Sequence, residues 1–421
     1  MNRVISLFRS MYGTVAIMVY VIVATCSFSA CSKDDGTQPF VSPYAENRTV
    51  MVYMVAENSL NKNVAGDIQE MLAGMDNDTL FVGDRLVIYI DDLKMPRIYV
   101  VDKNTKKTSL SDLTPVKEYV EDVNSSSAEQ LQTFVDYVKN QYPADSYGLV
   151  LWSHSSGWVP SGFSDDESYE AFSRRKTFGV DNGRNAKNND FGYQMEIPDM
   201  AAALEAALEG RKLEFIFFDA CVMQNIEVAY ELRHVAKSLI ASPAEIPAPG
   251  ANYKTMVRAM FRNNGYVDKM LEVYKHEYSK TAYGLVISAI KTSAMDDYAT
   301  YMKSIVAAHR SEMMALNTSS MLNYIHYGEW TSDYPDFLDM QGIMLKVLDD
   351  EEYVQWKAAT DKMVTCLHVG HWYTGYIKKS IQIDDAQCCG VSMFIPFAKY
   401  NSTSFNTDYY TTSWAKAVWK E

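Results

Sequence analysis

Residues 147–158 read YGLVLWSHSSGW, and residues 213–224 read LEFIFFDACVMQ. Each stretch is a short run of aliphatic and aromatic residues that leads into a chemically reactive side chain, His154 in the first and Cys221 in the second. Neither run alternates between apolar and polar positions, which is typical of strands covered on both faces in a parallel sheet. The two stretches therefore predict two buried strands, each followed by a reactive residue at its carboxyl end.

Further apolar runs of the same kind lie along the chain. They are TVMVYMVA (49–56), DRLVIYI (84–90), SLIA (238–241), GLVISA (284–289) and CGVSMFIPF (389–397). Helical patterns separate several of them, at 126–142, 195–208 and 222–235. The first of these helices is expected to begin with a capping box formed by Ser126 and Glu129. Alternating strands and helices predict an α/β fold with a mostly parallel central sheet flanked by helices.

Ligands collect at the carboxyl ends of strands in open parallel sheets, so His154 and Cys221 would share an edge if their strands are neighbours. An imidazole can accept the proton of a thiol, and the start of a helix after Cys221 would favour the thiolate. Backbone amides of Cys221 and of the turn after His154 could stabilise an oxyanion. A cysteine after a strand is also commonly a buried packing residue, and the residues alone leave both interpretations open.

The composition is that of an ordinary globular protein, with 48% hydrophobic and 22% charged residues among 421. The formal net charge of −14 argues against nucleic acid as a main partner, because phosphate contacts require an excess of Lys and Arg. The sequence has no CxxC pair, HExxH motif, phosphate-binding loop or strand-linked GxGxxG motif. His368 and His371 have near-helical spacing but no carboxylate partners in view, so no metal site is predicted.

The first thirty residues have the pattern of an export signal. Arg3 and Arg9 precede an apolar stretch at 15–24 that is too short to cross a bilayer, which takes about 20 residues. Ser29-Ala30-Cys31 then resembles a bacterial lipobox, with Cys31 as the acylated first residue of the mature protein. We expect a lipid anchor in the bacterial cell envelope, on the outer membrane, periplasmic or surface-exposed. A plain secretory signal is the alternative, and Cys26 is a weaker candidate for the lipid.

The expected organisation is a signal peptide at 1–30, a polar tether at 31–47 and a catalytic core at 48–260. Residues 261–421 would complete the sheet and add a small C-terminal subdomain. A polar stretch at 165–190 interrupts the core and is expected to be a long functional loop. It carries three consecutive basic residues, Arg174, Arg175 and Lys176.

The two reactive stretches closely resemble the signature blocks of the clostripain family of cysteine peptidases. The blocks are YPADSYGLVLWSHSSGW (142–158) and FIFFDACVMQNIEVAYEL (215–232); the segments at 50–60, 194–204 and 241–250 are also similar to the family. The resemblance covers residues 48 to 260 and is thinner beyond. It implies kinship with caspases, gingipains and legumain, a caspase-like layered sandwich, and hydrolysis after Arg or Lys by a Cys–His dyad.

Matching this sequence to the family's motifs assigns roles to single residues. His154 would be the general base or acid and Cys221 the nucleophile. Asp219 would line the S1 pocket, because a basic P1 side chain needs a carboxylate when it is buried. Glu245 is a second candidate for S1. Asp219 could instead cap the following helix.

The backbone amides of Ser155 and Cys221 would form the oxyanion hole. Many members have Gly at the position of Ser155, and a Cβ there restricts the turn. Family members are often zymogens cut between the two blocks, which makes Arg174, Arg175 and Lys176 candidates for self-cleavage. The resemblance implies no required cofactor, and calcium is a possible one.

Two other functions fit the same sequence. The chain could be a catalytically silent surface lipoprotein that binds peptides or glycans in the same cleft. It could also be a nutrient-capture lipoprotein that binds carbohydrate, a reading suggested by its 29 Tyr and 7 Trp. The presence of both His154 and Cys221 favours the peptidase.

Overall fold

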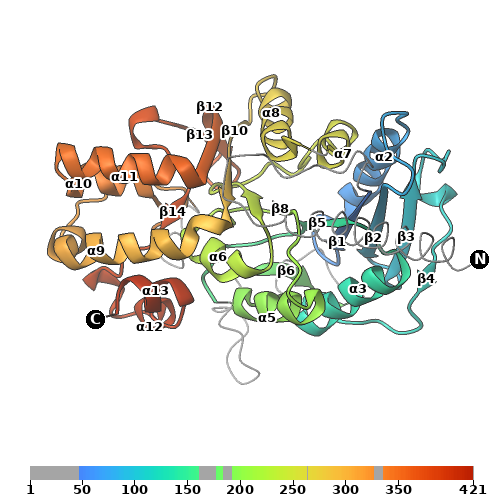
Figure 1. The fold of residues 1–421 in the computed structure, drawn as a ribbon, viewed down its shortest axis with the longest axis horizontal. Coiled ribbons are helices and arrows are strands. Elements are labelled where there is room, and N and C mark those ends of the chain that lie inside the picture. Colours follow the sequence, from blue (N-terminus) through green and yellow to red (C-terminus); the bar gives the residue numbers. More distant parts are fainter. Residues whose placement is uncertain (1–46, 161–176, 184–191, 263, 327–334, 421) are drawn as a thin grey trace, which may run out of the picture. The chain divides into compact units, whose positions relative to one another are not determined.

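Ten strands form one mixed sheet in the order β13-β12-β10-β9-β8-β5-β1-β2-β3-β4 (Figure 1). The computed structural model describes residues 47–160, 177–183, 192–262, 264–326 and 335–420. The five central strands are parallel. They are β9 (Ser238–Ala241), β8 (Phe215–Asp219), β5 (Ser146–Trp152), β1 (Arg48–Val55) and β2 (Arg85–Asp91).

Antiparallel strands extend both sides of this parallel centre. One side carries β3 (Arg97–Asp102) and β4 (Lys117–Glu118); the other carries β10 (Gly284–Lys291), β12 (Val364–Thr374) and β13 (Lys379–Gln382). Residues beyond 260 therefore supply three strands of the same sheet that holds β5 and β8.

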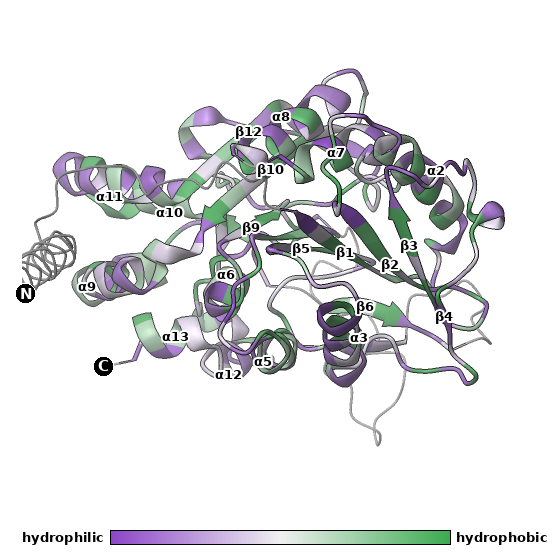
Figure 2. Ribbon diagram, turned by 45° about the vertical axis from the view of Figure 1, so that its right-hand side comes forward, coloured by the Kyte–Doolittle hydropathy of each residue, from purple (hydrophilic) through white to green (hydrophobic). Residues whose placement is uncertain are grey.

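Helices cover both faces of the sheet, which explains why its strands are continuous apolar runs. On one face lie α2 (Val64–Met75), α7 (Tyr253–Met260) and α8 (Tyr266–Tyr278), and on the other α3 (Ala128–Gln141), α5 (Ile197–Leu208) and α6 (Ile226–Glu231) (Figure 1). All eight residues of β1 are buried, and successive side chains alternate between the two cores: Met51 and Tyr53 enter one, Val52 and Met54 the other. Each such side chain contributes about 1.5–3 kcal/mol when fully buried. In Figure 2 the strands β1, β2 and β3 are mostly green, whereas the helices carry both green and purple.

The C-terminal part adds a helical layer beside the sheet (Figure 1). It consists of α9 (Met295–Met314), α10 (Met340–Val347), α11 (Asp350–Met363), α12 (Phe405–Tyr409) and α13 (Ser413–Val418). Two short ribbons lie outside the large sheet, β11 (Leu338–Asp339) with β14 (Ser392–Met393) and β6 (Phe178–Asp181) with β7 (Tyr193–Met195). None of the described helices combines the length and the apolar character needed to cross a membrane.

The predicted α/β class with helices flanking a central sheet is confirmed; the centre of the sheet is parallel, and antiparallel strands extend it on both sides. Each apolar run before residue 290 lies in this sheet. The run at 389–397 was wrongly expected to be a full strand, because only Ser392–Met393 pairs, and with β11 rather than with the large sheet. The helix after residue 126 is capped by Ser127, whose side chain accepts from the amide of Gln130, and not by Ser126. The stretch 165–190 is not one loop, since it contains β6.

Gly148 in β5 lies directly against the ring of Phe215 in β8: an added Cβ would stand 2.4 Å from the ring atom Cζ. We expect Gly148→Ala to lower the free energy of unfolding by about 1–3 kcal/mol, because the core has no room for the methyl group.

Gly66 in α2 is exposed, and a Cβ added there would meet nothing within 4 Å, so Gly66→Ala should raise the free energy of unfolding by up to about 1 kcal/mol. Urea unfolding midpoints check both, and equal midpoints for the two variants would contradict the packing argument.

Candidate active site

The parallel pairing of β5 with β8 sets the position of the two reactive residues. The register places Trp152 beside Asp219, so His154 and Cys221 each follow two residues after a paired position. Both residues line one cleft of about 190 Å³, together with Ser155, Asp219 and Glu245. The structure thus brings together all the described residues that the sequence singled out for catalysis and substrate binding.

Cys221 lies in a turn, not at the start of a helix. A helix was expected to begin at residue 222, but α6 begins only at Ile226, after the N-cap Asn225. Cys221 is therefore not at a helix N-terminus, and no helix dipole acts on its thiol as expected. The turn is made by Val222, whose φ of 52° is unusual for a β-branched residue. Its amide bonds to Ala244 O at 3.0 Å, which anchors the turn to the segment after β9.

The same segment supplies a polar contact to the sulfur. The amide of Ile246 donates to Cys221 Sγ at 3.3 Å. A donor placed at the sulfur stabilises the thiolate over the thiol. The thiol also donates to the carbonyl of Ile246 at 3.8 Å, so the backbone of this one residue contacts the sulfur both as donor and as acceptor.

His154 is held by its backbone and by its ring. Its carbonyl accepts from the amide of Gly179 at 2.9 Å, and Nε2 lies 2.9 Å from Ser59 Oγ. Ser59 follows β1, so three neighbouring segments of the molecule meet at this imidazole. Ser59 was not predicted to be part of the site, because nothing in the segment AENSL (56–60) distinguishes it from the neighbouring polar residues.

Two contacts tie the turn after His154 to the turn of Cys221. The Ser155 hydroxyl donates to Cys221 O at 2.5 Å, and the amide of Trp158 donates to Asn225 Oδ1 at 3.1 Å. Gly157 has a φ of 76°, and an added Cβ would lie 2.2 Å from Asn225 Oδ1. Glycine is thus required at 157, while serine at 155 adds a cross-link between the two reactive turns.

Asp219 forms a buried acidic wall of the cleft and is only 5% exposed. Its carboxylate accepts from the amide of Ala251 at 3.0 Å and from the hydroxyls of Tyr253 at 2.8 Å and Tyr274 at 3.3 Å. Burial raises the pKa of this carboxyl, and these three donors oppose the rise. Asp219 does not cap α6, which rules out the structural alternative for this residue.

Glu245 reaches a different part of the molecule. Its two oxygens accept from Thr374 Oγ1 at 2.5 Å and from the amide of Gly375 at 2.9 Å, at the turn between β12 and β13. Burial raises the pKa of this carboxyl as well. The next residue of that turn, Tyr376, also lines the cleft, so Glu245 fixes one wall of the cleft through the β12–β13 hairpin.

Asp67 is a second buried carboxyl near Asp219 that the sequence analysis missed. It lies on α2, and its Oδ2 accepts from the indole of Trp152, which lines the cleft, at 2.9 Å. Burial and the charge of Asp219 raise its pKa to about 8. The signal was present, since Asp67 is a charged residue within the buried stripe of Val64, Ile68 and Met71.

The remaining predicted residues lie elsewhere. Cys31, Arg174, Arg175 and Lys176 are outside the described residues. His368 is on β12 with Nε2 3.4 Å from Asp385 Oδ1, and His371 pairs with Gln382 in the same hairpin. Neither histidine belongs to a group of metal-ligand side chains within the described parts of the chain.

Residues 52–421 match the model of the clostripain family of peptidases. This chain belongs to the clostripain family. Clostripain from Hathewaya histolytica is 27% identical over 226 residues, which span 49% of this chain and 40% of that protein. The matched region is thus less than half the length of that relative.

Two solved structures resemble this member of the clostripain family over most of its length. A secreted C11 cysteine protease from Bacteroides thetaiotaomicron, in complex with an irreversible peptide inhibitor, is 28% identical, with a TM-score of 0.72 over 88% of this chain and 98% of the other. An inactive zymogen C11 protease from Parabacteroides distasonis is 27% identical, with a TM-score of 0.72 over 90% and 100%. By family and fold the chain is classed as a cysteine endopeptidase of caspase-like architecture.

Asp67 gives the protein a pH-dependent stability. A carboxyl whose pKa is raised from 3.8 to about 8 on folding stabilises the folded state fully below pH 4, and this contribution is lost as the pH rises towards 8. Asp67→Asn removes that loss. We expect the variant to gain about 1–3 kcal/mol over the wild type between pH 5 and pH 8. Urea midpoints at the two pH values measure the gain, and the exposed Asp78→Asn is the control. A difference that does not change with pH would contradict the argument.

Proposed function

We propose that this protein hydrolyses peptide bonds on the carboxyl side of Arg or Lys, with Cys221 as nucleophile and His154 as general base and acid. One observation carries the proposal: a thiol, an imidazole and a buried carboxylate from two adjacent parallel strands line a single cleft. Paired Cys and His suit acyl transfer, and a carboxylate in a cleft whose described lining residues include no Lys or Arg suits a cationic substrate side chain.

The first half-reaction forms a thioester. His154 takes the proton of Cys221 Sγ, the thiolate attacks the peptide carbonyl, and the amides of Ser155 and Cys221 hold the oxyanion. Collapse of the tetrahedral intermediate breaks the C–N bond, and His154 gives its proton to the leaving amine. In the second half-reaction His154 takes a proton from water, whose oxygen attacks the thioester; the C–S bond breaks, the acid product leaves, and His154 returns the proton to the sulfur of Cys221.

Asp219 is the proposed partner of the P1 side chain. Its carboxylate lines the cleft and is oriented by Tyr253, Tyr274 and the amide of Ala251. A guanidinium or ammonium group in the pocket would compensate a charge whose burial is otherwise costly. Glu245 acts indirectly on the pocket, by hydrogen bonds that hold the β12–β13 turn and its cleft residue Tyr376 in place.

Active-site labelling tests the proposal directly. Acyloxymethyl ketone probes with Lys or Arg at P1 should modify Cys221 of the wild type, and Cys221→Ala and His154→Ala should remain unlabelled. Asp219→Asn should lower the labelling rate by about a hundredfold, because the cationic P1 group loses its charged partner. The exposed Asp78→Asn is the matched control.

A folded, already cleaved wild-type protein that reacts with neither probe would instead be a silent binding lipoprotein. Equal labelling of wild type and Asp219→Asn would remove Asp219 from the S1 pocket while leaving the dyad in place.

We also propose that the chain is lipid-anchored at Cys31 and cuts itself after Arg174, Arg175 or Lys176. The support is the lipobox-like SAC sequence, the basic cluster between the two reactive blocks, and the zymogen form described for the related C11 protease from P. distasonis.

Intact mass of protein purified from bacterial membranes should show an acylated chain that begins at Cys31 and a second chain that begins after one of the three basic residues. In Cys221→Ala the protein should remain uncut. A single uncut chain in active wild-type protein would contradict self-cleavage, and an unacylated chain would contradict the anchor.

A further inference from the structure

Two cysteines that the proposed mechanism does not use lie in contact with each other. Cys366 is on β12, where it pairs with Ser288 of β10, and Cys388 is in the segment between β13 and β14. Both are free thiols in the structure, and the thiol of Cys366 is hydrogen-bonded to that of Cys388. Two segments that are separated in the chain thus bring their sulfur atoms together.

The surrounding structure holds the segment of Cys388 against β12. The side chain of Cys366 packs against the backbone of Gly390, where an added Cβ would lie 2.4 Å from Cys366 Sγ. Gly390 is fixed to β10 in turn, because its carbonyl accepts from the hydroxyl of Ser288 at 2.6 Å. The hydroxyl of Tyr324 lies 3.5 Å from Cys388 Sγ. Contacts with β10 and with Tyr324 therefore keep the two thiols in place.

The neighbouring Cys389 is held in a different way. It is buried, its amide donates to the two oxygens of Asp339 at 3.0 and 3.1 Å, and its thiol donates to Val391 O at 3.8 Å. A disulfide between adjacent residues would be strained, because their Cα atoms lie about 3.8 Å apart across a trans peptide, below the usual range of about 4.4–6.8 Å. Cys366 is therefore the partner that the geometry offers to Cys388.

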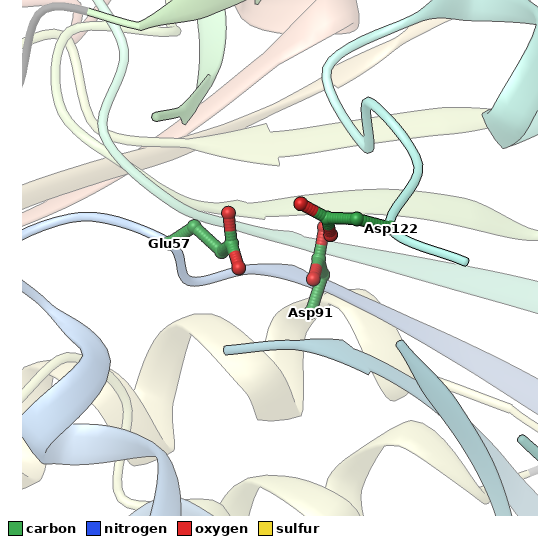
Figure 3. Close-up of side chains that lie close together, drawn as sticks. All are labelled: Glu57, Asp91 and Asp122. Carbon is green, nitrogen blue, oxygen red and sulfur yellow. The ribbon is translucent and has the colours of Figure 1, made fainter. Parts of the chain in front are cut away.

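Paired thiols can also serve as metal ligands, but such sites use three or four protein ligands. Among the described residues, the only side chains of metal-binding type that lie close together as a group of three are Glu57, Asp91 and Asp122 (Figure 3). No cysteine belongs to that group. The chemistry available to Cys366 and Cys388 is thus that of a pair of thiols.

We propose that Cys366 and Cys388 form a disulfide bond that closes the base of the β12–β13 hairpin. The two cysteines flank the paired residues of this hairpin, which lie within 371–382. Glu245 holds the turn at the other end of the hairpin, and Tyr376 of that turn lines the cleft. The bond would hold this wall of the cleft covalently at its base. It would do so whether or not the protein is a peptidase.

The bond forms by thiol–disulfide exchange with a disulfide oxidant, for which oxidised glutathione is the probe. The hydrogen bond to Cys388 and burial raise the pKa of the Cys366 thiol, so Cys388 is expected to react first. Its thiolate attacks the glutathione disulfide, and one glutathione leaves with the proton of Cys388. Cys366 then loses its proton and attacks Cys388 Sγ, which releases the second glutathione. Two protons and two electrons pass from the cysteines to glutathione.

Differential alkylation of the Cys221→Ala protein tests the bond without any turnover. The protein is equilibrated with oxidised glutathione, unfolded in guanidinium with iodoacetamide, and then reduced and treated with N-ethylmaleimide. Peptide mapping should find iodoacetamide on Cys389, which is the internal control, and N-ethylmaleimide on Cys366 and Cys388. Mapping before reduction should find the peptides of Cys366 and Cys388 joined to each other and not to glutathione.

Hydrogen exchange provides a second readout, with Cys388→Ser as the variant that cannot form the bond. Amides of residues 371–382 should exchange about tenfold more slowly in the oxidised Cys221→Ala protein than after reduction with dithiothreitol. The same protein carrying Cys388→Ser, shown to be folded by circular dichroism, should exchange alike under both conditions. The proposal is overturned if Cys366 and Cys388 accept iodoacetamide after oxidation, if Cys389 replaces either of them in the bond, or if oxidation leaves exchange at 371–382 unchanged.

Discussion

The parallel pairing of β5 with β8 is the constraint on which the site depends. Because the register places Trp152 beside Asp219, the chain leaves the sheet at the same level on both strands, and the two reactive residues follow at equal distance. The side chains of β5 and β8 are buried on both faces of the sheet. If the register slipped by one residue, every side chain of the slipped strand would move to the opposite face, and the packing of both cores would be lost. The same packing contacts therefore fix both the core and the positions of His154 and Cys221.

The turns beyond these strands are held by contacts to each other as much as by the sheet. Ser155 binds the carbonyl of Cys221, Asn225 binds the amide of Trp158, and Val222 is held in an unusual backbone conformation by Ala244. A backbone conformation of this kind costs on the order of 1–3 kcal/mol and persists only where neighbours enforce it. Here the neighbours are the histidine turn and the segment after β9, so the reactive turns support one another.

Much of this could be predicted from the sequence because the signals are local. The central strands are uninterrupted apolar runs, and His154 and Cys221 follow two of them directly. β12 was missed because it is a half-buried strand in which polar residues such as Thr365 and His368 break the run. The start of α6 was misplaced because the apolar residues Val222 and Met223 continue the helical pattern into the turn. Ser59 depends on a contact between segments far apart in the chain, which no periodicity encodes, whereas Asp67 stands out as a charged residue within the buried stripe of α2.

The hydrogen bonds between Glu245 and the β12–β13 turn have a consequence for how the protein can be divided. One wall of the cleft is set by residues more than a hundred positions after the cysteine, and β10 pairs with the outer edge of β9. A fragment ending near residue 260 would keep both reactive side chains but would expose the backbone of β9 and release the wall that carries Tyr376. An uncovered strand of this kind invites pairing between chains. The two segments that carry His154 and Cys221 are thus not sufficient to form the cleft, because its walls come from the whole sheet.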